Sequence, residues 1–400
     1  MTSVSPASKV SLGRGRPALL FATLMLGPMS QGLAFTAFVA ALPQMALDFG
    51  ARGALIAQMM VGLAALGMLV GALASGWILE RAGTLGTVVG STLAFGLAGA
   101  AGLYPIGAAV LLASRFVVGF ASACMTTACM WGIGAEYDGD RRARALGVAS
   151  GLGSVAALAG TVLGGFIAQH AGWHLAFAQF PVFAAAGLLL AGLGMRQVKR
   201  FARTGGARGT PFLMRLLPFY ILATLLFAVM FMGSTQFAFL LQSDGVGSSS
   251  TRSLFIGAIT VVGAVTSLSY GSLQKRLSAT GAFAAGLLCM TLSLAAIGAS
   301  AAPVFAAAGA VLMGLYVGIT SPYVYHEVTE RTGDDVRGRA IGVLSAFCYL
   351  GAFLNPPAFA SLSQWMGLRG AFFVTALVMA ALTAATAVRL LSRRGAARAG

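Results

Sequence analysis

Long apolar segments that recur along the whole chain constrain this sequence more than any other feature. A helix of roughly 20 apolar residues is long enough to cross the hydrocarbon core of a bilayer. The bilayer core has no water to satisfy an open backbone, so such segments must fold as helices. The sequence therefore predicts an all-α polytopic membrane protein with twelve transmembrane helices, at residues 17–42, 54–79, 84–104, 106–134, 144–168, 174–195, 212–242, 253–274, 279–299, 303–328, 339–363 and 370–392.

Charged residues are rare and unevenly placed. They make up 9% of the chain, whereas a soluble domain carries about 25%. Twelve spans put both termini on one side, and placing them in the cytoplasm leaves 22 Lys and Arg there. Only Arg52, Arg252 and Arg369 fall outside, and Arg115 falls within a span. This excess matches the positive-inside rule. The net charge of +16 therefore predicts topology in a cell membrane, and no nucleic-acid partner. The preference for Arg over Lys suggests a bacterial inner membrane.

One polar stretch divides the chain into two halves. The segment "MRQVKRFARTGGARGTPF" is the longest polar run and separates six spans from six. We therefore expect an N-terminal six-helix bundle at 1–195, a cytoplasmic central linker at 196–211 and a C-terminal six-helix bundle at 212–400.

The two halves repeat one another at an offset of 195 residues. "RRARALGVAS" (141–150) matches "VRGRAIGVLS" (336–345), and "QHAGWHLAF" (169–177) matches "QWMGLRGAFF" (364–373). Each half is thus a copy of one six-helix unit. A transporter built from two such halves has its site at their interface, near the middle of the membrane.

Three short motifs carry a resemblance to a known family. They are "GWILERAG" (76–83), with a second copy "GSLQKRLS" (271–278), "LLASRFVVGF" (111–120) and "GLGSVAALAGTVLGG" (151–165). With these motifs the chain resembles the major facilitator superfamily of secondary transporters over essentially its whole length. The third motif is similar to one associated with antiporters, although Thr161 replaces its proline. The resemblance to the drug-efflux branch implies alternating access, with protons as the coupling ion.

The resemblance also implies a latch between the halves on the cytoplasmic side. In the first motif Glu80 replaces Asp, and Thr84 and Leu85 stand where the family has a basic pair, so the latch is weakened. The expected latch residues are Gly76, Glu80, Arg81, Gly83, Glu136, Arg142, Arg144, Gly271, Lys275, Arg276, Glu330, Arg337 and Arg339. The alternative is a set of solvated turns, since exposed ion pairs contribute little.

Glycines in the fifth span form a second structural motif. Gly151, Gly160, Gly164 and Gly165 are small residues whose spacing allows two helices to approach closely. The motif is read either as the antiporter signature or as general small-residue packing.

In this family the first, fourth, seventh and tenth helices line the central cavity. The resemblance thus implies a substrate cavity that contains Gln31, Phe35, Phe38, Arg115, Met125, Thr126, Met130, Phe227, Met230, Phe231, Thr235, Gln236, Tyr316, Thr320, Tyr323 and His326, with Asn355 from the eleventh helix. Aromatic and Met surfaces adapt to varied apolar ligands, which favours amphipathic, drug-like or secondary-metabolite substrates. The alternative is that these side chains serve packing or face lipid.

Arg115 is a charge inside the membrane, where such residues face the protein interior. Since no Asp or Glu lies at that depth, we expect Arg115 to bind an anionic substrate group. The alternative is a structural tie between the first and fourth helices. The nearest candidates for proton coupling are His326 and Glu327 at one end and Asp48 at the other.

The predicted function is secondary active export of small molecules. The coupling that the resemblance implies is proton antiport. The alternatives are an importer or facilitator of a metabolite, and a transport-dead membrane sensor or scaffold. An enzyme is not expected, because no catalytic or metal-ligand cluster lies at depth. No cofactor or metal is predicted, and we expect a monomer in the lipid bilayer.

Overall fold

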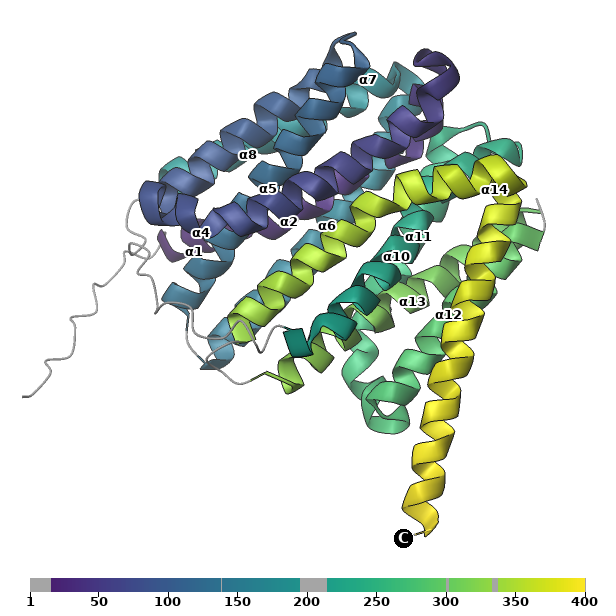
Figure 1. The fold of residues 1–400 in the computed structure, drawn as a ribbon. Coiled ribbons are helices and arrows are strands. Elements are labelled where there is room, and N and C mark those ends of the chain that lie inside the picture. The colour runs from purple at the N-terminus through teal and green to yellow at the C-terminus, as the bar shows by residue number, and fades with distance from the viewer. Residues whose placement is uncertain (1–15, 138, 195–213, 300–301, 333–336, 400) are drawn as a thin grey trace, which may run out of the picture.

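The computed structural model describes residues 16–137, 139–194, 214–299, 302–332 and 337–399, and within these ranges its regular elements are helices (Figure 1). The predicted linker 196–211 lies outside the described residues. The helices are α1 (Arg16–Leu24), α2 (Leu26–Thr36), η1 (Val39–Ala41), α3 (Leu42–Asp48), η2 (Gly50–Arg52), α4 (Gly53–Ala100), η3 (Ala101–Leu103), α5 (Ala108–Glu136), α6 (Gly139–Ala171), α7 (Trp173–Ala176), α8 (Gln179–Gly194), α10 (Leu217–Ser243), α11 (Ser249–Leu277), α12 (Ala279–Ala299), α13 (Pro303–Glu330) and α14 (Arg337–Ala399).

Ten helices of the described chain are long and apolar enough to cross a membrane. Two of these segments, Gly53–Leu103 and Ala340–Leu390, are 51 residues long, which is far more than one crossing needs. Each turns back at a glycine, Gly83 in α4 with φ 68° and Gly367 in α14 with φ 73°. Each is therefore a pair of spans, and the predicted fold of twelve transmembrane helices is confirmed.

The internal repeat extends to the backbone. Left-handed residues occur in pairs that are 195 residues apart: Gly50 with Gly245, Gly83 with Ser278, and Gly172 with Gly367. A side chain is disfavoured in this conformation, and glycine occupies five of these six positions. Each pair marks the same turn between spans in the two halves.

The two halves meet along two pairs of helices. We call α1–α8 the N half and α10–α14 the C half, and Figure 1 shows them side by side. Across their interface α4 contacts α14 and α6 contacts α11. We call the end of the molecule where α6, α10 and α14 begin the basic end, since Arg81 and Arg276 lie there, and the end that carries α7 the opposite end.

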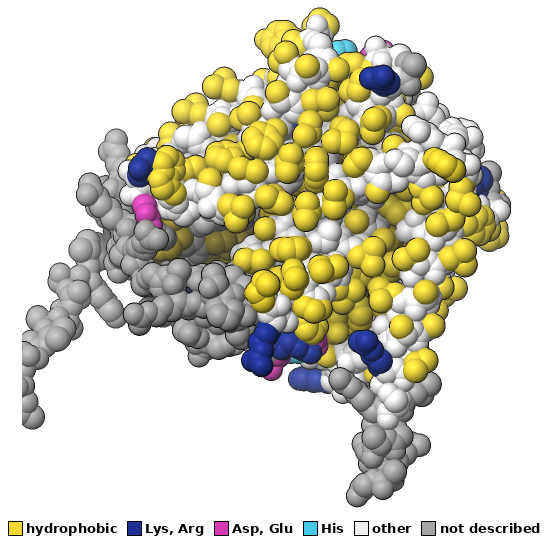
Figure 2. All heavy atoms as spheres, viewed as in Figure 1, with side chains coloured by type: hydrophobic (Ala, Val, Ile, Leu, Met, Phe, Trp, Pro, Cys, Tyr) yellow, Lys and Arg dark blue, Asp and Glu magenta, His cyan; other side chains and the backbone are white. Residues whose placement is uncertain are grey.

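The outer surface is apolar. Figure 2 shows hydrophobic side chains over the broad face of the helices, with Lys and Arg confined to its margins. Leu97, Val182, Leu189 and Leu268 are 67–89% exposed. Soluble monomers rarely expose apolar patches of this extent, so this face is suited to lipid. The helices and their surface together describe a multi-pass membrane protein.

Candidate functional site

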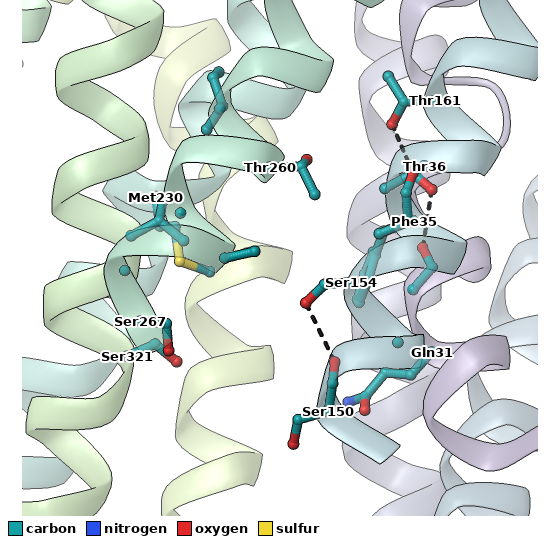
Figure 3. Close-up of a pocket in the computed structure, with 18 of the residues that line it drawn as sticks. Gln31, Phe35, Thr36, Ser150, Ser154, Thr161, Met230, Thr260, Ser267 and Ser321 are labelled. Carbon is teal, nitrogen blue, oxygen red and sulfur yellow. Dashed lines mark hydrogen bonds between the residues drawn. The ribbon is translucent and has the colours of Figure 1, made fainter. Parts of the chain in front are cut away.

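A cavity of about 470 Å³ lies between the two halves (Figure 3). Its walls come from α2 and α6 of the N half and from α10, α11 and α13 of the C half, with Val39 of η1 and Met130 of α5 added. The volume is within the usual range of small-molecule sites, roughly 300–1,000 Å³.

The cavity opens toward the basic end. Ser150 of α6 and Ser267 of α11 line it on that side, and both are exposed. At its far side Thr161 and Ile256 also line it, and both are buried. A molecule can therefore enter from the basic end in this conformation.

Two helices that the sequence interpretation passed over supply much of the lining. On α6 the lining includes Ser150, Ser154, Ala157 and Thr161, and on α11 it includes Ile256, Thr260, Gly263 and Ser267. Both sets follow the same spacing of four, three and four residues, which places each set on one helix face. That spacing of small and hydroxyl residues is a signal the sequence contains.

Five residues of the predicted cavity line it: Gln31, Phe35, Met130, Met230 and Phe231. Phe35 and Phe231 meet edge to face across the halves, with ring centroids 5.0 Å apart. The Gln31 amide nitrogen donates a hydrogen bond to the phenol oxygen of Tyr349 on α14. Side chains of the first and seventh helices thus meet at the cavity.

The other predicted cavity residues lie outside this lining, which corrects the expectation for them: Phe38, Arg115, Met125, Thr126, Phe227, Thr235, Gln236, Tyr316, Thr320, Tyr323, His326 and Asn355. Many of them pack helix against helix. The Thr126 hydroxyl donates to the Gly27 carbonyl at 2.9 Å, and the Tyr316 hydroxyl to the Leu226 carbonyl at 2.8 Å. Gly27 lets α2 approach α5 closely, since a Cβ there would lie 2.7 Å from the Thr126 Cα. Because α2 packs this closely against α5, little space for a ligand remains between these two helices.

Arg115 is fully buried away from the cavity. Its Nη2 donates to the carbonyls of Ala98 and Gly99 at 3.0 and 3.2 Å. Its guanidinium carbon lies 4.8–5.7 Å from the ring centroids of Phe38, Phe177 and Phe180. The last carbonyls of a helix lack partners within it and attract cations, and the ring faces stabilise the charge further. Arg115 therefore ties the third span to the fourth, and nothing in this geometry supports its contact with an anionic substrate.

A cluster of three buried amides and one hydroxyl lies beyond the cavity toward the opposite end. We call these residues, Gln58, Thr235, Gln236 and Asn355, the amide seal. Gln236 Nε2 donates to Gln58 Oε1 at 3.2 Å and to Asn355 Oδ1 at 3.3 Å. Thr235 Oγ1 donates to Asn355 Oδ1 at 3.1 Å. The bond to Gln58 links the C half to the N half. Three predicted cavity residues are thus brought together, but as a closure rather than as a wall.

A second closure lies nearer the opposite end, around Arg252. This side chain is fully buried, and its Nε donates to the Ala40 carbonyl of the N half at 3.1 Å. Beside it, the Ser249 backbone N–H donates to Gln169 Oε1 at 2.9 Å. The sequence predicts Arg252 only as an outside charge and offers no signal for this role. The two layers close the cavity toward the opposite end.

Three of the four motif glycines of the fifth span are contact points. A Cβ on Gly160 would lie 2.7 Å from Thr36 Oγ1, and one on Gly164 would overlap the Ala37 carbonyl oxygen. A Cβ on Gly165 would lie 2.5 Å from the Ser253 Cβ of the C half. Gly151 faces open space. The close-approach interpretation thus fits Gly160, Gly164 and Gly165 but not Gly151.

The predicted latch residues that the structure describes gather at the basic end. Gly76 and Gly271 have open space where a Cβ would stand, so the expected close helix contact is absent from both. Gly83 instead forms the turn in α4. The Arg81 guanidinium stacks on Trp77 at 3.9 Å, and that of Arg142 lies beside Gly134. Glu80, Glu136, Arg144, Lys275, Arg276 and Glu330 lie at the same end, and the side chains of Arg337 and Arg339 fall outside the described residues.

The proposed coupling residues lie at the two ends of the molecule, away from the cavity lining. His326 Nε2 is 2.9 Å from Gln274 Nε2, and Glu327 pairs with Arg331 one turn along α13. Asp48 accepts a bond from Trp173 Nε1 at 2.6 Å. Among the described residues no group of three or more His, Cys, Asp or Glu is placed to hold a metal.

Comparisons with known proteins agree with this architecture. Residues 24–354 match the model of the Major Facilitator Superfamily. Similar solved structures include a variant of the nucleoside transporter NupG (TM-score 0.74, 12% identity, 92% of this chain and 99% of that one). They also include a D-xylose-proton symporter (0.72, 14%, 91% and 97%). A third is a POT family transporter in complex with 5-aminolevulinic acid (0.73, 14%, 92% and 95%). No curated protein sequence matches the chain.

Proposed function

Because this chain belongs to the Major Facilitator Superfamily, it is a membrane transporter rather than an enzyme, and we propose that it exports amphipathic small molecules. The transported molecule binds in the cavity between α2, α6, α10, α11 and α13. The six-helix bundles at 1–195 and 212–400 are the two bodies that move against each other.

The uncharged cavity between the halves is the observation that carries this proposal. The described residues that line it include no Asp, Glu, Lys, Arg or His. Its walls combine apolar side chains such as Phe35, Met230 and Phe231 with scattered hydroxyls and one amide, Gln31. Sugars need many hydrogen-bond partners, whereas this lining suits a ligand that is mostly apolar. Drug-like and secondary-metabolite compounds have that chemistry.

The placement of the contacts supports alternating access. The amide seal and the Arg252 layer join the halves on one side of the cavity, while Ser150 and Ser267 are exposed on the other. Breaking the two layers and bringing the basic ends of α6 and α11 together would expose the cavity to the opposite side. Glu80, Arg81, Lys275 and Arg276 lie at that end and would hold that second state as the latch.

Flux measurements in reconstituted vesicles test the proposal. Purified protein is reconstituted in liposomes and supplied with a panel of lipophilic compounds. Cleavage of the linker by external protease distinguishes the molecules of the two orientations. Export predicts movement from the basic end to the opposite end. Movement in the other direction favours an importer or facilitator, a reading that the similarity to a D-xylose-proton symporter also raises. Absence of flux for the whole panel favours a sensor or scaffold.

Proton antiport is the finer part of the proposal, and it requires groups outside the cavity lining. His326 and Glu327 at the basic end, with Asp48 at the opposite end, are the proposed carriers. We expect His326→Ala or Glu327→Gln to change the pH dependence of flux, and Asp48→Asn to change it from the other side. The measurement is substrate flux in liposomes with an imposed pH gradient. Flux that is unaffected by collapse of the gradient would contradict proton coupling.

The topology is proposed with both termini in the cytoplasm of a bacterial inner membrane. It rests on the 22 Lys and Arg that fall on that side of the segment map. Reporter fusions after Arg203 and after Gly400 should give cytoplasmic activity, and a fusion near Ala171 should give external activity. The reverse pattern would invert the membrane orientation and, with it, the direction assigned to the basic end.

A further inference from the structure

Three of the four hydroxyls on the N-half wall of the cavity use their hydrogens within their own helices. Thr36 Oγ1 donates to the Gly32 carbonyl at 3.0 Å. Ser154 Oγ donates to the Ser150 carbonyl at 3.2 Å, and Thr161 Oγ1 to the Ala157 carbonyl at 2.9 Å (Figure 3). A hydroxyl has one hydrogen and two acceptor lone pairs. With the hydrogen directed to the preceding turn, each of the three presents an acceptor to the cavity.

Gln31 adds a further acceptor to the same wall. Its amide nitrogen donates to the phenol oxygen of Tyr349, which belongs to the C half and lies outside the cavity lining. With the nitrogen turned to Tyr349, the amide presents its oxygen on the other side. Tyr349 is therefore a positioning residue that sets which end of the Gln31 amide a ligand meets.

The facing wall, from the C half, is largely apolar, with hydroxyls only on Thr260, Ser267 and Ser321 among the described lining residues. Phe231, Met230, Ile259 and Val317 line it from the C half, and the faces of aromatic rings carry partial negative charge. The remaining lining hydroxyls, on Ser150, Thr260, Ser267 and Ser321, can donate or accept and so do not discriminate. A carboxylate or phosphate in this cavity would lose its hydration and meet no cation.

We propose that the transported molecule is a non-anionic amphipath with N–H or O–H donors along one edge, such as a lipophilic primary amine. The donors pair with Gln31, Thr36, Ser154 and Thr161, and the apolar part packs on Phe231 and Met230. This inference rests on the proposed function, because it takes the cavity as the transport site. It replaces the anionic substrate that Arg115 suggested.

Binding of matched probes to the purified full-length protein in detergent tests the donor requirement. The probes are a naphthylethylamine, its trimethylammonium derivative and the naphthalene carboxylate of equal chain length. Titration calorimetry should give the amine an affinity at least about tenfold above the carboxylate. The amine should also bind about threefold or more above the trimethylammonium probe, which has the charge but no donor.

Variants locate the effect on the N-half wall. Thr36→Val and Ser154→Ala should each weaken amine binding by about two- to tenfold, while leaving binding of the trimethylammonium probe unchanged. Tyr349→Phe should reduce the preference for amine over carboxylate, because it frees the Gln31 amide to turn. Ser269→Ala is the matched control, since its hydroxyl makes the same bond within α11, to the Val265 carbonyl at 3.0 Å, on an exposed face.

The outcomes separate the inference from the proposed function. Equal binding of the amine and either other probe, or binding of none of the three, would overturn the donor requirement. Selective binding of the amine without its flux in liposomes would contradict the exporter and leave the selectivity standing. Flux of the carboxylate at the rate of the amine would contradict the selectivity alone.

Discussion

Gly165→Leu is expected to stop transport and to hold the protein open toward the opposite end. In the present structure a Cβ on Gly165 would lie 2.5 Å from the Ser253 Cβ and 2.8 Å from the Ser249 carbonyl oxygen. A larger side chain must separate α6 from α11 at the place where the halves close. Overpacking of this kind costs typically about 1–3 kcal/mol, which lowers the ratio of this conformation to the one open toward the opposite end roughly 5- to 150-fold.

The conformational part of this prediction is measured by thiol labelling. Ser267→Cys places a thiol at the rim of the cavity on the basic end. We expect an impermeant maleimide to label it readily in the otherwise native protein and slowly when Gly165→Leu is added. Gly151→Leu is the control on the same helix, because Gly151 faces open space. Undiminished labelling together with undiminished flux would show that α6 and α11 tolerate the larger side chain.

Arg115→Ala is expected to destabilise the folded protein rather than to alter substrate selection. The substitution leaves the Ala98 and Gly99 carbonyls without their partner and opens a void among Phe38, Phe177 and Phe180. An unsatisfied buried polar group costs about 1–3 kcal/mol, and the void adds to this. A loss of several kcal/mol should follow, seen as a lower unfolding midpoint in detergent.

Conservative and distant variants show whether the guanidinium itself is needed. Arg115→Lys keeps the charge but not the planar fork, so it should recover only part of the stability. Arg52→Ala, at an exposed position of the opposite end, should leave the unfolding midpoint unchanged. If Arg115→Ala were stable and lost only the binding of anionic compounds, the structural role would be refuted.

The sequence was informative wherever a residue's role is local. The apolar segments predicted the twelve spans with small differences at their ends. Gly83, Gly172 and Gly367 stand where the backbone takes positive φ, a conformation that glycine accepts without steric cost. Gly160 and Gly164 were recognised as contact residues because small side chains at that spacing allow close packing.

The sequence was least informative on the cavity. It placed Gln31, Phe35 and Phe231 there but omitted the faces of α6 and α11, because small and hydroxyl residues resemble ordinary helix packing. It also assigned Tyr316 and Thr126 to the cavity, although their hydroxyls bond to neighbouring helices.

The sequence by itself determined that the chain spans the membrane twelve times, that its halves are repeats, and that Arg115 must be inside the protein. Only the tertiary structure decided that Arg115 binds the end of the third span, that Arg252 is buried between the halves, and which helix faces form the cavity. The physical reason is that a membrane helix is apolar all round, so hydrophobic pattern does not separate lipid-facing from protein-facing sides. Those sides are chosen by packing and by hydrogen bonds between helices that are distant in the chain.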